Sequence, residues 1–139
     1  LRTDVGSKVR LLLSEHEVPA STLAMHCFLG FLGDLKVEDA FTRFREEARR
    51  CDVTMYIYVV DEEQHLRGVI DINELLQADP KRKLEEIMTK NVVTVTPNTM
   101  RTDVEALFRK YRFRAIPIVD DSERIVGVIR EKDVFLLEE

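Results

Sequence analysis

The chain has 139 residues, of which 45% are apolar and 34% charged, and its formal net charge is −5. This composition is typical of a globule the size of one domain, which excludes a disordered chain, and the acidic balance argues against a nucleic-acid partner. The two cysteines, Cys27 and Cys51, lack the spacing of a thiolate metal site, and because no apolar run reaches the ~20 residues of a membrane span, direct membrane insertion is not expected.

The first predicted element is a helix over Ser7–His16, in which three apolar residues share one face. Residues 1–20 are therefore interpreted as an N-terminal helical segment that ends a preceding domain. The chain begins at Leu1 rather than Met, and a helix is still predicted at its last residues. We therefore expect it to be a piece of a longer protein.

Two series of elements follow in the same order. The first is a strand, an amphipathic helix, a β-hairpin and a short helix: Phe28–Leu32, Val37–Arg50, Tyr56–Val60 with Leu66–Ile70, and Ile72–Gln77. The second series is Val92–Thr96, Thr102–Tyr111, Ile116–Val119 with Ile125–Ile129, and Glu131–Leu137. Thr102 and Glu105 predict a capping box at the start of the second amphipathic helix.

The two series share a sequence motif. Val59-Val60-Asp61 followed by Gly68-Val69-Ile70 recurs as Ile118-Val119-Asp120 followed by Gly127-Val128-Ile129, with the same spacing in both copies. We predict an α/β (α+β) fold of two βαββα repeats, residues 21–79 and 80–139, preceded by the N-terminal helix. Each repeat alone leaves a sheet face bare, so the two are expected to pack as a pseudo-twofold pair.

From about Leu23 onward the chain resembles the CBS domain pair, named after cystathionine β-synthase. The residues that carry the resemblance are Ile87-Met88-Thr89, the Thr102–Tyr111 helix, Ala115–Asp120, and Gly127–Ile129 running to Asp133. A narrower match, to the cytosolic region of MgtE-type magnesium transporters, is seen in Val9–Leu12, Tyr56–Asp61, Ala78-Asp79-Pro80 and Glu85–Met88.

The narrower resemblance implies a regulatory module rather than an enzyme. It implies a homodimer on the cytoplasmic side of the cell membrane that reports magnesium or a nucleotide to a pore. The N-terminal helical domain and the membrane pore of that family would be missing from this chain. Two alternatives remain open: an adenine-nucleotide energy sensor that regulates an enzyme or another transporter, and a CBS dimerisation module without a ligand.

CBS pairs commonly bind adenosine nucleotides between the repeats, through a hydroxyl residue and an Asp three positions later. This chain has Asp71 and Glu74 at those positions in the first repeat, where a carboxylate would repel a phosphate. In the second repeat Arg130 could instead bridge a phosphate or pair with a neighbouring acid. The candidate nucleotide cleft, for ATP or AMP, therefore consists of Tyr58, Ile116, Pro117, Arg130 and Asp133.

Magnesium prefers oxygen ligands, so candidate contacts for Mg²⁺ are sought among the acidic residues. Acids in hairpin loops are also typical of solvated turns, and this alternative remains open. The resemblance implies further acids near Met100, Thr102 and Arg112, which this chain lacks. The candidate metal contacts are Asp61, Glu62, Asp71, Asp79, Asp120 and Asp121.

Overall fold

The structure is a computed structural model that describes residues 17–51 and 55–135. The helix predicted over Ser7–His16 lies outside the described residues, as does the end of the helix predicted over Glu131–Leu137. The described elements, in chain order, are α2 (Ala20–Leu23), β1 (Leu29–Leu32), α3 (Val37–Glu47), η1 (Ala48–Arg50), β2 (Tyr56–Val60), β3 (Leu66–Asp71), α4 (Ile72–Gln77), α5 (Leu84–Ile87), α6 (Arg101–Tyr111), β4 (Ala115–Val119), β5 (Ile125–Arg130) and α7 (Glu131–Phe135).

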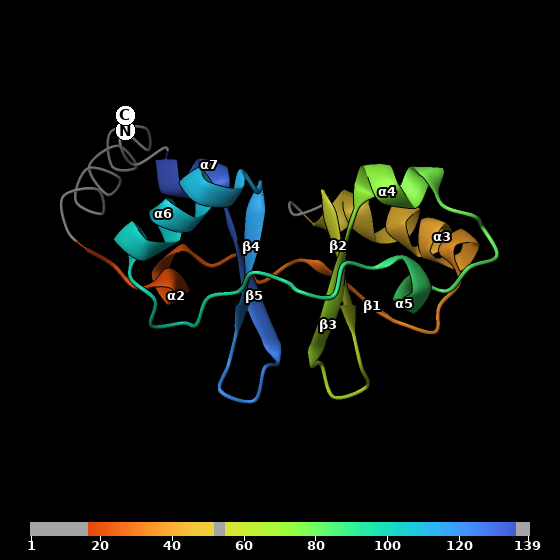
Figure 1. Cartoon of the computed structure of the whole chain (residues 1–139), viewed down its shortest axis with the longest axis horizontal. Helices are drawn as coiled ribbons and strands as arrows, with labels where there is room; N and C mark the ends of the chain where they lie inside the picture. Colours follow the sequence, from red (N-terminus) through yellow and green to blue (C-terminus); the bar gives the residue numbers. More distant parts are fainter. Residues whose placement is uncertain (1–16, 52–54, 136–139) are drawn as a thin grey trace.

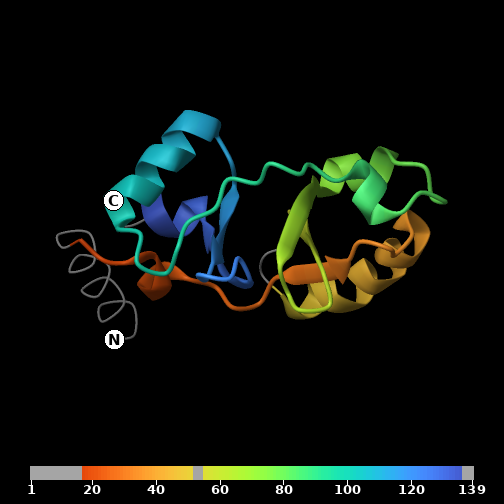
Figure 2. The same ribbon diagram turned by 60° about the horizontal axis from the view of Figure 1, so that its bottom comes forward.

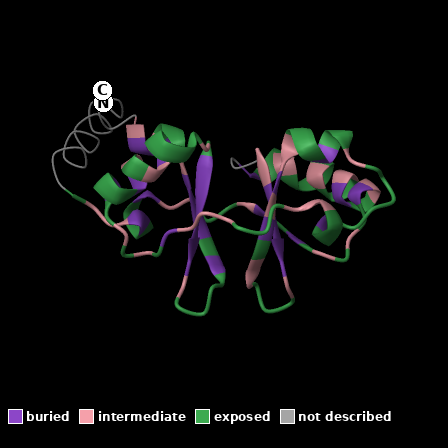
Figure 3. Ribbon diagram, viewed as in Figure 1, coloured by how far each residue is buried: buried purple, intermediate pink, exposed green. Residues whose placement is uncertain are grey.

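The elements form two units whose strands stand side by side at the centre, with helices on the outer flanks (Figure 1). In the first unit, β1 pairs parallel to β2 and β2 pairs antiparallel to β3. In the second, β4 and β5 form an antiparallel pair. The buried residues follow the strands and the inner faces of the helices, whereas the hairpin tips are exposed (Figure 3). The predicted α/β (α+β) fold class is therefore confirmed.

The two hairpins are built alike, as the sequence repeat predicts. Val59 lies opposite Gly68 and Ile118 lies opposite Gly127, and each register shifts at the next residue. Each hairpin tip contains one residue with a positive φ. This residue is Gln64 in the first hairpin, with φ 71°, and Glu123 in the second, with φ 65°. The repeat in sequence is thus a repeat in backbone geometry.

The strand predicted over Val92–Thr96 is wrong as a regular strand. Only Val95 pairs, in a parallel bridge in which its N–H donates to Pro117 O and its carbonyl accepts from Val119 N. Turns on either side limit the pairing, because Val92 N–H donates to Lys90 O and Thr99 N–H donates to Thr96 O. High β propensity therefore yields a single bridge here.

The capping box predicted from Thr102 and Glu105 is also wrong. The helix α6 begins one residue earlier, and its N-cap Met100 makes no side-chain cap. The backbone N–H and the hydroxyl of Thr102 both donate to the Glu17 carboxylate instead, and the hydroxyl bond is the chief reason that the pKa of Glu17 is lowered. A residue distant in sequence thus supplies the acceptor that a local cap would have provided.

Each unit also contains residues from outside its own hairpin and main helices. In the second core, Ala20 and Leu23 of α2 pack with buried residues of β4, β5 and α6. Met25 bridges Val128 of β5. In the first core, Leu84 of α5 is fully buried, and Thr89 bridges Val69 of β3.

The chain therefore crosses between the units twice, between Met25 and Leu29 and again between Thr89 and Val95. Both crossings are visible from two directions (Figures 1 and 2). The boundary predicted after residue 79 follows the sequence repeat, whereas each spatial unit combines segments from both of its sides.

The repeated glycines mark the places where these segments meet the hairpins. A Cβ added at Gly68 would lie 2.5 Å from Met88 Sδ, and one added at Gly127 would lie 3.3 Å from Ala24 Cβ. Only a residue without a side chain allows the approach at Gly68. The glycine of the Gly-Val-Ile motif is thus required by packing in the first unit.

Candidate ligand site between the repeats

A cavity of about 240 Å³ lies between the two units. Its lining comes from β2, β3 and α4 of the first unit, from β4 and the residues before it in the second, and from the second crossing segment. The lining residues are Tyr56, Tyr58, Val69, Asp71, Glu74, Thr89, Asn91, Val92, Val93, Phe113, Ala115 and Pro117. The cavity is therefore a site that exists only because the two repeats are paired.

Tyr58 is the most unusual residue in this lining. It is 0% exposed, yet among the described residues its Oη has no hydrogen-bond partner. Its ring is held edge-on by Phe28 at 6.2 Å and tilted against Tyr56 at 6.3 Å between centroids. Burial raises the pKa of its hydroxyl, so the group stays protonated and is a donor without an acceptor. A buried polar group of this kind is destabilising unless a ligand completes it.

Two carboxylates also line the cavity, and Asp71 pairs with Tyr56 in the register of β2 and β3. Asp71 caps α4 by accepting from Asn73 N at 2.8 Å, and Glu74 accepts from Asp71 N at 3.1 Å, which together form a capping box. This reciprocal pair fixes both side chains at the cavity. None of the lining residues is a lysine, arginine or histidine. The charged part of the cavity wall is thus entirely acidic.

The structure separates the residues predicted for the nucleotide cleft. Tyr58 and Pro117 line the cavity, but Ile116 is 0% exposed and belongs to the second core. Arg130 and Asp133 pair with each other at the start of α7, through Nε to Oδ2 at 2.6 Å and Nη2 to Oδ1 at 3.0 Å. This pairing is one of the two roles the sequence left open for Arg130.

Sequence reasoning did not place Tyr56, Asn91 or Phe113 at the cavity. Tyr56 carries a partial signal, because residues i and i+2 of a strand share a face and Tyr58 was a candidate. Phe113 precedes β4, and its ring stacks on Tyr111 with centroids 5.5 Å apart. Asn91 lies on the crossing segment, whose path no local pattern reveals.

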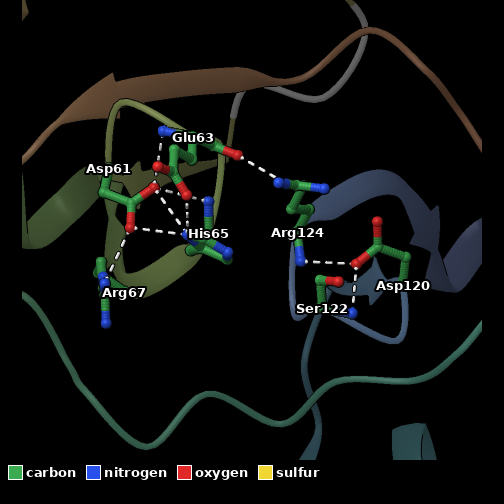
Figure 4. A network of polar contacts seen from close by, with 7 residues as sticks. All are labelled: Asp61, Glu63, His65, Arg67, Asp120, Ser122 and Arg124. Carbon is green, nitrogen blue, oxygen red and sulfur yellow. Dashed lines mark hydrogen bonds and ion pairs between the residues drawn. The ribbon is translucent and has the colours of Figure 1, made fainter.

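The predicted metal contacts Asp61 and Asp120 occupy equivalent places in the two hairpin turns (Figure 4). Oδ1 of Asp61 accepts from the backbone N–H groups of Glu63 and His65, both at 2.9 Å. In the second hairpin, Oδ1 of Asp120 accepts in the same way from the second and fourth residues after it, at 2.9 and 3.0 Å. Both aspartates therefore shape turns, as the alternative interpretation of these acids expected.

Asp61 is also the centre of an ion-pair group. Its Oδ2 lies 2.9 Å from His65 Nδ1 and 2.8 Å from Arg67 Nη2. Partial desolvation favours the protonated acid, but the hydrogen bonds from His65, Arg67 and Glu63 outweigh it and hold the pKa of Asp61 well below its ordinary value. In the other hairpin, a backbone hydrogen bond from Arg124 is the chief reason that the pKa of Asp120 is lowered.

The two hairpin tips are joined to each other. Leu66 N–H donates to Glu123 O and Ile125 N–H donates to Gln64 O, at 3.0 and 3.1 Å. Arg124 Nε also donates to Glu63 O at 3.1 Å (Figure 4). The tips therefore hold the units together at one end.

The remaining predicted metal contacts are dispersed. Asp79 accepts from Lys81 N at 2.9 Å in a turn, Asp71 caps α4, and Glu62 and Asp121 are exposed. A wider hollow of about 500 Å³ includes Asp61 and Glu62, but Arg67 and Lys90 line it too. Across the part of the chain that the structure describes, no three His, Cys, Asp or Glu side chains gather in a way that could hold a metal ion.

Comparison with known proteins places these features in a family context. The sequence matches the CBS domain model over residues 31–81 and 84–138. It is 33% identical over 128 residues to the magnesium transporter MgtE of Thermus thermophilus, covering 92% of this chain and 28% of that protein. It is 25% identical over 132 residues to MgtE of Enterococcus faecalis, covering 95% of this chain and 29% of that protein.

The fold comparison agrees. The crystal structure of the cytosolic domain of the Mg²⁺ channel MgtE in complex with ATP matches with a TM-score of 0.84 and 33% identity, over 86% of this chain and 48% of that one. This chain thus spans less than a third of the length of the two transporters. None of the helices described above combines the length and apolar character that crossing a bilayer requires.

Proposed function

The chain belongs to the CBS domain family, and from this premise we propose that it is the regulatory CBS pair of a magnesium transporter of the MgtE type. The observation that carries the proposal is the 33% identity to the Thermus thermophilus transporter, which extends over 92% of the chain. In this role the module lies on the cytosolic side of the membrane and performs no catalytic step. The repeats divide near residue 80, and the pore belongs to the rest of the polypeptide.

The mechanism is a population shift between two packings of the module. A ligand changes such an equilibrium only by binding one packing more tightly than the other. The inter-repeat cavity meets this condition, because its lining belongs to both units and to the second crossing segment. The structural relative that binds ATP supports an adenosine-type ligand for the module.

Magnesium is the second signal in this proposal. Within the described residues of one chain, no three His, Cys, Asp or Glu side chains are placed to hold a metal ion, so in this proposal a cation is held by acids from two copies or from further segments. A homodimer through the helical faces supplies such a second copy. Leu76 of α4 and Tyr111 of α6, 59% and 41% exposed, offer apolar contacts for it.

Two measurements test the proposal. Thermal unfolding of the chain should shift upward by several degrees with Mg²⁺ or with an adenosine ligand, since a ligand at ~100 times its Kd adds about 2.7 kcal/mol. Ion flux through the full transporter should lose its dependence on Mg²⁺ when this chain is deleted. Flux that keeps the same Mg²⁺ dependence without the chain would refute the regulatory role.

A further inference from the structure

The wall of the inter-repeat cavity has a chemistry that suits one class of ligand. Three aromatic residues, Tyr56, Tyr58 and Phe113, line it together with two carboxylates, those of Asp71 and Glu74. The rings offer faces and edges to a planar heterocycle. The Phe113 ring is itself held by its stack on Tyr111, so this part of the wall is formed in advance.

The polar groups of the wall define the complementary atoms of the ligand. The acceptors on this wall are carboxylate oxygens, because Tyr58 is fully buried and its hydroxyl is not open to the cavity. The carboxylates of Asp71 and Glu74 each use one oxygen for the capping box and accept through the other. Paired carboxylate acceptors suit the hydroxyls of a sugar diol or an amino group.

A phosphate is the group that this wall disfavours. Among the described residues, no lysine, arginine or histidine lines the cavity to neutralise a phosphate, and Asp71 brings a half-buried negative charge to the wall. The cavity volume of about 240 Å³ also falls short of the usual size of ligand pockets, ~300–1,000 Å³. Charge and size therefore act in the same direction, against a nucleotide with its phosphates.

We infer that the inter-repeat cavity selects a nucleoside-type ligand, a planar base with a sugar and no phosphate, over the corresponding nucleotide. The inference rests on the proposed function for the use of this cavity as the ligand site, and it deepens that proposal by naming the ligand class. It applies to this chain because the charged side chains among the lining residues, Asp71 and Glu74, are both acidic.

The test compares adenosine, AMP and ATP as probes, by calorimetric titration of the 139-residue chain with a chelator present to remove bridging cations. Adenosine should bind at least about tenfold more tightly than AMP. This minimum corresponds to the repulsion between one phosphate and a partly screened carboxylate. Equal or tighter binding of AMP or ATP would overturn the inference.

A matched pair of variants assigns the cause. Asp71→Ser keeps a side-chain cap for α4 while removing the charge, so the preference for adenosine over AMP should shrink about fivefold or more. Asp79→Ser removes the same charge outside the cavity and keeps an acceptor for Lys81 N–H, so the preference should not change. If Asp71→Ser does not fold, the affinities of the unmodified chain for adenosine, AMP and ATP still test the inference.

Failure of this inference is distinguishable from failure of the proposed function. Absence of binding by all three probes overturns the inference, while the flux measurement on the full transporter still tests regulation by magnesium. Conversely, a chain that prefers adenosine but whose deletion leaves flux unchanged supports the inference and refutes the transporter role.

Discussion

Removal of the Tyr58 hydroxyl should make the unliganded protein more stable. The Oη atom is buried and has no hydrogen-bond partner among the described residues, and burial without a partner costs about 1–3 kcal/mol. Tyr58→Phe removes that cost, keeps the ring contacts with Phe28 and Tyr56, and leaves a space of only one atom. We expect a net gain of about 1 kcal/mol, which corresponds to a rise in Tm of about 4 °C for a chain of this size.

Tyr56→Phe is the matched control, because its hydroxyl lines the same cavity but accepts a hydrogen bond from Arg114 N–H at 3.3 Å. Its loss should destabilise the protein by about 0.5–1.5 kcal/mol. Urea unfolding followed by circular dichroism measures both variants, and the two changes should have opposite signs. A destabilisation above about 1 kcal/mol by Tyr58→Phe would refute the reasoning, since the hydroxyl would then have a partner in the unliganded state.

Three further predictions concern the packing and the hairpin charges. Gly68→Ala should cost about 1–3 kcal/mol in urea unfolding, because its Cβ would displace Met88; unchanged stability would contradict the close approach. Leu84→Ala should cost about 2–5 kcal/mol although Leu84 lies outside the first repeat, and a smaller loss would show that α5 is not part of the first core. Asp61→Asn should destabilise the protein at neutral pH. The difference in stability between Asp61→Asn and the unmodified protein should shrink as pH falls below 3.8, the ordinary pKa of an aspartate. The reason is that the pKa of Asp61 is lower in the folded state, so its stabilisation is present above that pH and is lost in acid. Unfolding curves measured across this range that show a constant difference would contradict the assignment.

The fold was largely predictable because its signals are local or repeated. Continuous apolar runs begin both hairpins, and the recurrence of Val59–Ile70 as Ile118–Ile129 establishes that the same unit occurs twice. The two errors have different causes. Val92–Thr96 has strand propensity, but local turns on either side leave one pairing residue. The first turn of α6 is completed by the distant residue Glu17 rather than by its own side chains.

The candidate site was predictable only in part. The departure of Asp71 and Glu74 from the family pattern, and the inference that this cleft repels phosphate, came from the sequence alone. The unpartnered hydroxyl of Tyr58 could not be predicted from the sequence, because it depends on the positions of all the neighbouring side chains. Nor could the pairing of Arg130 with Asp133, since the sequence permitted two roles and only the geometry distinguishes them.

The two crossings have a consequence for how signals travel through the module. The described chain enters at Glu17, which is bonded to α6, and leaves at Phe135 in α7, so both ends are anchored to the second unit. The first unit therefore lies to one side of the unit that holds both ends of the described chain. The first unit is connected to the second through the hairpin tips and the two crossings. A ligand in the cavity would add a further connection, present only while the ligand is bound.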